Sequence, residues 1–328
     1  MLFRSGAGQL VSTGCTTVAN IEAVPDIVAR LRQSTPLRVH SFVEMTGVRS
    51  GRDPADIVSG AIGFMKEWDD GSHRGGAGLS PHAPYSTLPG LLLHVADAAR
   101  TLGCRVTMHL AESREEFEMF MYRRGPMHDW LHLQRPGDDC GHGSPVRHAA
   151  RHGLLGPGFI AVHVNYLWDD DARLLGDSGS HVVHCPQSHA YFRHQRFPAP
   201  DLAAAGVNLC LGTDSLASTR GPGGGRPTLS MFDEMAAYMA HDSTVSPAEV
   251  IAMATVNGAR ALGIGDGTGT LAPGAPADLC AIPDEPSVSD VHEVVLGHRG
   301  VAAGTWIRGV KAWQGHGCVI PPATPEVA

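Results

Sequence analysis

The sequence of 328 residues lacks any long hydrophobic run. No apolar stretch approaches the roughly 20 residues that a membrane-spanning helix requires, so an integral helical membrane protein is excluded. The first residues, Met1 to Gly8, contain no hydrophobic segment of the kind found in a secretory signal peptide. We therefore expect a soluble, cytoplasmic protein with no membrane partner.

Clustered positive charge is also missing. The chain has 25 lysines and arginines against 33 aspartates and glutamates, and its net charge of −8 is spread along the sequence. Nucleic-acid binding is driven mainly by clustered basic residues. DNA and RNA are therefore not expected partners.

Closely paired cysteines are absent as well. The seven cysteines are odd in number and scattered, and none shows the spacing of a zinc knuckle. Several lie inside apolar, strand-like segments, as reduced core thiols do. This usage is typical of a reducing compartment.

What the sequence does contain is enough apolar material for a large core. Apolar residues make up 43% of the chain, and the 40 glycines and 23 prolines indicate many tight connections between short elements. The length suits one large α/β domain with an appendage, or two ordinary domains.

Short apolar runs rich in β-branched residues alternate with helix-like segments. The predicted strands cover residues 16–21, 37–45, 78–80, 106–110, 159–164, 181–184 and 207–211. They are continuous apolar runs, as expected for parallel strands that are covered on both faces. Seven strands fit a doubly wound sheet, whereas a closed barrel of this type has eight.

Two predicted helices, and a C-terminal region of short strands, complete the pattern. Apolar residues at three- and four-residue spacing predict a helix over 91–102. Ser246, Pro247 and Glu249 predict the start of another helix, which we expect to run to Leu262 and to stop at Gly263. We place the main domain at 1–268, and a small β appendage, with strands at 279–282 and 304–310, within 269–328.

Polar residues that can bind metals stand at the ends of several predicted strands. His109 ends one strand and Glu112 follows it, His163 and His184 end two others, and Asp214 follows the last. In a parallel barrel these ends meet at one rim, where active sites are built. Imidazole and carboxylate groups together suit zinc or iron, with one position left open for water.

Taken alone, each of these residues has a plainer explanation. Most of the 19 histidines must be surface or hydrogen-bonded core residues, and Gly-Thr-Asp-Ser at 212–215 is an ordinary turn sequence. Glu112 stands where a carboxylate would stabilise the start of a helix. Their recurrence at successive strand ends favours a common site, and the short spacing from His109 favours a catalytic Glu112.

An ordered series of motifs carries a family resemblance. The series is Ser80-Pro-His-Ala-Pro-Tyr85, His109-Leu-Ala-Glu112, His163-Val-Asn165, His184-Cys-Pro-Gln-Ser-His189 and Gly212-Thr-Asp-Ser215. It resembles the amidohydrolase superfamily, nearest the branch of cytosine, guanine, S-adenosylhomocysteine/methylthioadenosine and aminodeoxyfutalosine deaminases and related chlorohydrolases. Residues 254–263 resemble the family's last barrel helix, and residues 269–279 resemble its return into a small β-sandwich. The likeness runs from about residue 14 to about residue 310.

The resemblance implies roles for the strand-end residues. His109 and Asp214 would bind the metal, and His163 would be a further ligand or a hydrogen-bond partner of the metal-bound water. Zinc is the expected metal, with iron as the alternative. The metal would lower the pKa of that water, Asp214 would take its proton, and Glu112 would pass a proton to the substrate's ring nitrogen and the departing ammonia. Glu112, His163 and Asp214 are therefore the expected catalytic residues.

One part of the family pattern has no counterpart here. Family members carry a metal-binding His-x-His pair on the first barrel strand, whereas the first histidine of this chain is His40. We therefore expect a TIM-like (β/α) barrel without its first strand, and an incomplete metal site. Either the reading frame begins further upstream, or the chain is a true fragment with a broken site.

Several residues are candidate contacts to a substrate. His82 resembles a substrate-contacting histidine, although its neighbouring prolines suit a purely structural role equally well. Ser188 and His189 either line the pocket or cap the turn after their strand. Trp130, in the insertion at 115–142, either covers the pocket and stacks on a planar ring or is simply exposed. We expect His82, Glu112 and His189 to contact substrate.

These observations lead to three functional interpretations. The first is a metal-dependent hydrolase that deaminates a small amino-heterocycle of purine or pyrimidine type. The second is ring dechlorination or cyclic amide hydrolysis on the same scaffold. The third is an inactive, truncated paralogue that acts as a binding or assembly module. Relatives often form dimers, which leaves a homodimer open.

Overall fold

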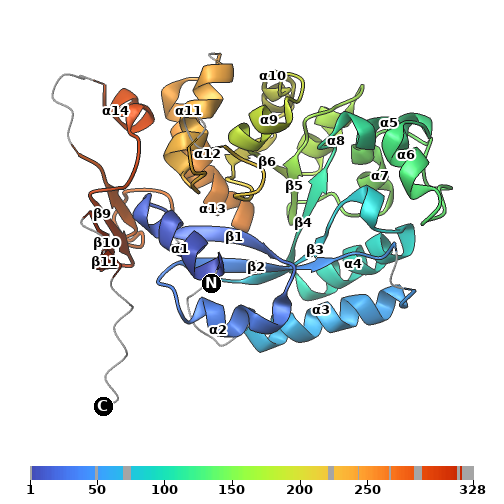
Figure 1. Ribbon diagram of the computed structural model, residues 1–328, viewed down its shortest axis with the longest axis horizontal. Helices are drawn as coiled ribbons and strands as arrows, with labels where there is room; N and C mark the ends of the chain where they lie inside the picture. Colours follow the sequence, from blue (N-terminus) through green and yellow to red (C-terminus); the bar gives the residue numbers. More distant parts are fainter. Residues whose placement is uncertain are drawn as a thin grey trace.

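The structure is a computed structural model that describes residues 2–48, 51–68, 75–220, 225–242, 244–265, 267–283, 290–315 and 318–319. Parallel strands β1 to β7 form one sheet that curls into an incomplete barrel (Figure 1). They are Thr17–Glu22, Arg38–Met45, Ala77–Pro81, Arg105–Leu110, Phe159–His163, His181–His184 and Asn208–Leu211.

The order of the strands identifies the architecture. Each strand pairs with the next one along the chain, from β1 to β7. A doubly wound sheet would instead reverse its strand order at a switch point. The prediction of a TIM-like (β/α) barrel without one strand is confirmed, and all seven predicted strands are present.

Helices cover the outer side of this sheet (Figure 1). Those between the strands are α2 (Val28–Arg32), α3 (Pro54–Trp68), α4 (Pro89–Leu102), α5 (Arg114–Tyr122), α6 (Pro126–Leu131), α7 (Pro145–Arg151), α8 (Asp171–Asp177), α9 (Pro186–Phe192) and α10 (Ala199–Ala204), with 3-10 turns η1 (Pro25–Ile27) and η2 (Pro84–Ser86). After β7 follow α11 (Met231–His241), α12 (Pro247–Ala254) and α13 (Val256–Leu262).

The main core lies between the sheet and these helices. Leu79 and Met108 of the sheet, and Leu92 and Val95 of α4, belong to one hydrophobic cluster and are fully buried. Burying a side chain of this size stabilises the fold by about 1.5–3 kcal/mol. The continuous apolar runs of the sequence follow from this burial on both faces of the strands.

The helix predicted to run from residue 247 to 262 is two helices, and that prediction was wrong at one position. Its start is as expected, because Ser246 and Glu249 form a capping box. At Thr255 the backbone leaves the helical region, with φ −130° and ψ −96°, so that α12 ends and α13 begins. Gly263 then closes α13 in the left-handed conformation, φ +70°, as predicted.

A small antiparallel sheet follows the barrel. It contains β8 (Leu279–Ala281), β9 (Gly304–Ile307), β10 (Val310–Gln314) and β11 (Cys318–Val319), in the order β11-β10-β9-β8. The strand predicted at 304–310 is a hairpin, because Arg308 and Gly309 both have positive φ, as a tight two-residue turn requires. Helix α14 (Val291–Gly297), which was not predicted, packs on α11 and α12.

The N-terminal helix α1 (Leu2–Ser12) lies between the small sheet and β1 (Figure 1). Thr305 Oγ1 donates a hydrogen bond of 2.8 Å to the carbonyl of Val11. Arg38, at the start of β2, forms a buried ion pair with Asp278, just before β8. The small sheet is therefore joined to the barrel by polar contacts as well as by apolar packing.

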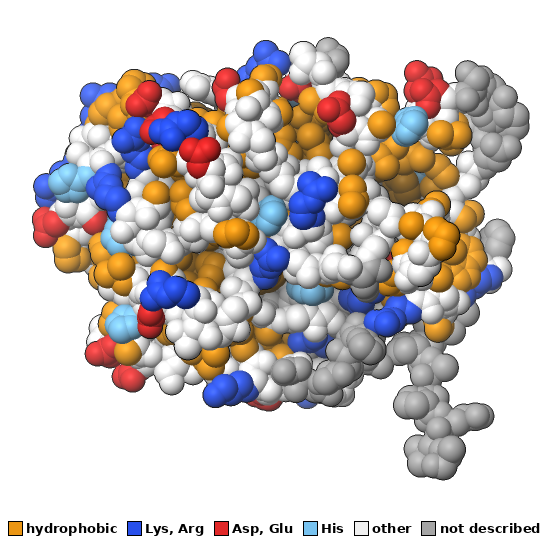
Figure 2. Space-filling model, turned by 180° about the vertical axis from the view of Figure 1, so that it is seen from behind, with side chains coloured by type: hydrophobic (Ala, Val, Ile, Leu, Met, Phe, Trp, Pro, Cys, Tyr) orange, Lys and Arg blue, Asp and Glu red, His pale blue; other side chains and the backbone are white. Residues whose placement is uncertain are grey.

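The surface agrees with the even charge pattern of the sequence. On the face seen in Figure 2, basic and acidic side chains are interspersed among apolar and uncharged ones. Within the described residues, no helix combines the length and apolar character needed to cross a membrane.

Candidate active site

The predicted site residues follow the carboxyl ends of β4, β5 and β7. His109 is the penultimate residue of β4, His163 is the last residue of β5, and Asp214 follows three residues after β7. Since all seven strands run in parallel, these ends share one rim of the barrel. Glu112 lies in the short connection between β4 and α5.

The backbone at this rim is unusually strained. Ala111, His163, Val164 and Asp214 have positive φ values of 49°, 76°, 52° and 49°. Such values cost on the order of 1–3 kcal/mol at a non-glycine residue, and they cluster at functional sites. Their concentration after β4, β5 and β7 is independent support for a site here.

The structure brings His109, Glu112 and His163 together. The rings of His109 and His163 stack with their centroids 5.5 Å apart, and His163 Nε2 lies 3.7 Å from Glu112 Oε1. His163 is buried, with 3% of its surface exposed, whereas the Glu112 side chain keeps 24%. The Glu112 carboxylate is therefore partly accessible to solvent.

Asp214, after β7, lies within electrostatic reach of His109, Glu112 and His163. Its Oδ2 accepts a hydrogen bond of 2.6 Å from Ser188 Oγ, and its Oδ1 accepts one of 2.7 Å from the amide of Ser215. The negative charge of Asp214 raises the pKa of Glu112 and opposes the lowering of the pKa of His163. Ser188 thus holds the Asp214 carboxylate by a hydrogen bond.

The pKa of Glu112 lies near neutrality. Burial, and secondly the charge of Asp214, raise its pKa to about 7. The plainer role of stabilising the start of α5 belongs to Glu116 instead, whose carboxylate accepts hydrogen bonds from the amides of Ala111 and Glu112. Within the described residues, the Glu112 carboxylate itself accepts no hydrogen bond, and its nearest charged partner is His163 at 3.7 Å.

The histidines of the site are neutral at pH 7. Burial, and secondly the neighbouring His109, lower the pKa of His163 to about 3. His109 Nδ1 lies 3.0 Å from the carbonyl oxygen of His82. Because a carbonyl can only accept, Nδ1 carries the proton, and the lone pair of Nε2 is available for a ligand.

The two histidines predicted to contact substrate lie on either side of this group. The ring of His82 is 5.1 Å from that of His109, and its Nδ1 is 2.7 Å from Ser86 Oγ. His189 Nδ1 is 3.0 Å from the side-chain oxygen of Asn165. Both rings are therefore held in place by their own neighbours.

Two further residues of the sequence pattern are His184, whose ring also meets that of His189 at 5.1 Å, and Trp130. The ring of His184 stacks on Phe197 at 3.8 Å and meets Tyr238 at 6.0 Å, in the core between sheet and helices. It shares the face of the fully buried Val182, two residues before it. Trp130 is 59% exposed on α6, and its role as a lid stays a prediction.

Two polar residues near the candidate site had no predicted role. Asn165 Nδ2 donates to the backbone carbonyl of Glu112, and its Oδ1 accepts from His189, so Asn165 links the two. Glu44, in β2, acts electrostatically on His109. An acidic residue near the end of an otherwise apolar predicted strand was the available signal for Glu44.

The donor types of this group suit zinc, but the set is partial. Neutral imidazole and carboxylate are common zinc ligands, and His109 has its second nitrogen fixed by a carbonyl, as metal-binding histidines usually do. Among the described residues, however, no group of three such side chains is arranged to hold a metal ion.

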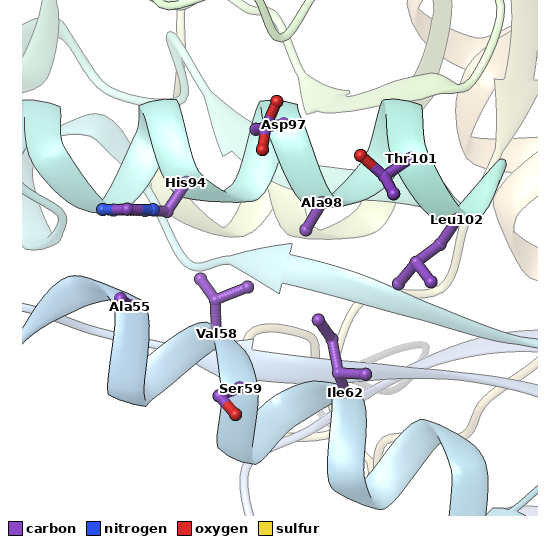
Figure 3. A pocket seen from close by; sticks show the side chains of 9 residues that line it. All are labelled: Ala55, Val58, Ser59, Ile62, His94, Asp97, Ala98, Thr101 and Leu102. Carbon is purple, nitrogen blue, oxygen red and sulfur yellow. The ribbon is translucent and has the colours of Figure 1, made fainter.

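A groove elsewhere on the surface is separate from this rim. It lies between α3 and α4, has a volume of about 290 Å³, and is lined by side chains such as Val58, Ile62, His94 and Leu102 (Figure 3). These residues belong to the outer helix layer, and none of them is a candidate site residue.

Comparison with known proteins places this geometry in context. The sequence model of the Amidohydrolase family matches residues 1–311. A 5-methylthioadenosine/S-adenosylhomocysteine deaminase of Moorella thermoacetica is 31% identical over 286 residues, which cover 84% of this chain and 60% of that protein. A 5'-deoxyadenosine deaminase of Methanoregula boonei is 30% identical over 288 residues, covering 84% and 58%. The chain thus spans about three fifths of the length of these relatives.

Solved structures share the fold. An adenosine deaminase from Xanthomonas campestris, with bound zinc, superimposes with a TM-score of 0.81 at 24% identity, covering 97% of this chain and 70% of that one. The aminofutalosine deaminase of Helicobacter pylori also gives a TM-score of 0.81, at 19% identity, covering 94% and 76%. At these identities the likeness establishes the fold.

Proposed function

The chain belongs to the amidohydrolase family, and we propose that it acts in the hydrolytic deamination of small amino-heterocycles. The observation that carries the proposal is the contact of Glu112 with His163 at 3.7 Å, within electrostatic reach of Asp214. The names of the relatives, deaminases of adenosine-type nucleosides, support a purine-like substrate.

Glu112 is proposed to move the proton. A group with a pKa of about 7 is present in both protonation states at neutral pH, so it can give a proton to a ring nitrogen and take one back. Asp214 has a different environment, exposed and bound by Ser188 and Ser215. Two carboxylates in different environments allow a division into acid and base.

The family is metal-dependent, and zinc is the proposed metal of this site. His109, through Nε2, and Asp214 would contribute to holding it, with His163 as a third contributor. When bound, a divalent cation supplies a nucleophile at neutral pH by acidifying water. His109 and His163 are neutral, so both present a lone pair where a cation would lie.

His82 and His189 are proposed to position the substrate. Each lies beside the central group and has its Nδ1 fixed by a neighbour. This leaves Nε2 of His82 to contact a ligand, whereas His189 also has a backbone hydrogen bond at Gln195. Fixed rings orient a planar heterocycle at little cost in side-chain entropy.

The test is a comparison of matched glutamate variants. We expect zinc-supplemented enzyme to release ammonia from adenosine-type nucleosides, and Glu112→Gln to lower kcat by about 10²–10⁴-fold, the usual contribution of general acid–base catalysis. Glu293→Gln, on exposed α14, serves as the control and should keep full activity.

Product analysis decides between the proposal and its alternatives. Release of chloride from a chlorinated ring, or an opened ring without ammonia, would instead support the second interpretation, ring dechlorination or cyclic amide hydrolysis. Metal-loaded protein that releases no ammonia from any member of an amino-heterocycle panel would contradict the proposal.

A further inference from the structure

The inner face of β2 carries a carboxylate that has no role so far. Phe42 clusters with Ile160 of β5 and Cys210 of β7, which are not neighbouring strands, so its side chain lies inside the curled sheet. Val43 and Met45 instead belong to the outer core. Because alternate residues of a strand share a face, Glu44 lies on the same inner face as Phe42.

Ser80 of β3 stands beside Glu44. The two residues are partners in the parallel register, as are Phe42 and Gly78. A Cβ added to Gly78 would come within 2.5 Å of the Phe42 ring, so paired residues of β2 and β3 share a face here. Ser80 is 0% exposed, and its Oγ has no hydrogen-bond partner within the described residues.

Glu44 is also unengaged, although it is close to the site. Within the described residues, its side chain makes no hydrogen bond or ion pair, and the residue is half-buried. Its negative charge acts on both His109 and Tyr85. Along the sheet, the pair of Glu44 and Ser80 lies one layer below His82 and His109, toward the inside of the barrel.

We propose that Glu44 is a substrate-binding residue whose carboxylate accepts a hydrogen bond from an N–H or O–H donor of the substrate, with the Ser80 hydroxyl beside it. This inference rests on the proposed function and specifies its substrate class. An ionised carboxylate can only accept. The substrate is therefore a heterocycle that presents a donor on an edge away from the carbon that reacts.

The experiment measures dissociation constants by calorimetry for two pairs of ligands. Adenine and 9-methyladenine differ in a ring N–H, whereas adenosine and 2',3'-dideoxyadenosine differ in sugar hydroxyls. The proteins are the full chain, Glu44→Ala, Glu44→Gln, Ser80→Ala and the control Glu67→Gln, an exposed glutamate of α3. Circular dichroism checks each fold, and the isosteric Glu44→Gln carries the test if Glu44→Ala does not fold.

The wild-type chain should bind the donor member of one pair about ten- to a hundredfold more tightly, as for a hydrogen bond to a charged group. Glu44→Ala should bring this ratio close to one, Glu44→Gln should lower it in part because the amide keeps one acceptor, and Ser80→Ala should lower it less. Glu67→Gln should leave the ratio unchanged. The pair that responds identifies the donor as ring N–H or sugar O–H.

Three results would overturn the inference. They are an unchanged ratio in Glu44→Ala, an equal weakening of both members of a pair, and no wild-type preference in either pair. Ammonia release, measured in parallel with excess zinc present, separates the two proposals. Ammonia without a Glu44-dependent ratio refutes the inference alone, a Glu44-dependent ratio without ammonia refutes the proposed function alone, and neither signal refutes both.

Discussion

A buried arginine gives the sharpest prediction about how the site is supported. The side chain of Arg135 is 0% exposed and pairs with Asp139. Its Nη1 donates hydrogen bonds of 3.0 and 2.9 Å to the carbonyls of Pro84 and Tyr85. These carbonyls belong to the segment that follows His82. Arg135 therefore links the insertion at 115–142 to a segment that lies next to the candidate site.

Replacing Arg135 by methionine should be strongly destabilising. Asp139, whose side chain is 8% exposed, would lose its cation. His148 Nε2 lies 3.8 Å from Asp139 but cannot replace it, because burial lowers the pKa of His148 to about 3. Removing one partner of a buried pair costs about 3–5 kcal/mol. We expect the free energy of unfolding to fall by that amount.

Urea unfolding followed by circular dichroism measures the loss. Arg114→Met is the matched control, because the Arg114 side chain is 65% exposed and exposed ion pairs contribute about 0–1 kcal/mol. The double variant Arg135→Met/Asp139→Asn should recover part of the loss, since the buried charge is then gone. A single Arg135→Met variant within about 1 kcal/mol of wild type would refute the reasoning.

Two further predictions concern metal and pH. Since the described residues gather no group of three metal donors, the 328-residue chain should retain well below one zinc per chain after dialysis, measured by elemental mass spectrometry; a tightly held equimolar zinc would contradict this. Burial raises the pKa of Glu234 to about 8, above its value near 4.5 in the unfolded chain. The folded state therefore binds more protons between these values, and stability should fall as pH rises from about 5 to 8. Glu234→Gln should flatten this fall in urea titrations at both ends of the range, and an unchanged slope would exclude Glu234 as its source.

The sequence by itself determined the architecture and most of the candidate site. The apolar runs required strands covered on both faces, and parallel strands place their carboxyl ends on one rim. His109, Glu112, His163 and Asp214 were identified for this reason. The capping box of Ser246 and Glu249 was equally predictable from the sequence, because it depends only on residues four positions apart or fewer.

Only the tertiary structure decided which way individual side chains face. Both His163 and His184 end strands, but His184 keeps the regular alternation and turns into the outer core, whereas His163 has φ +76° and stacks on His109. The position of Glu44 inside the barrel could not be predicted for a related reason. Its inward direction follows from the packing of Phe42 across the barrel. Local apolar patterns predict where the strands lie. The direction in which the side chain of a strand's last residue points depends instead on the curl of the whole sheet.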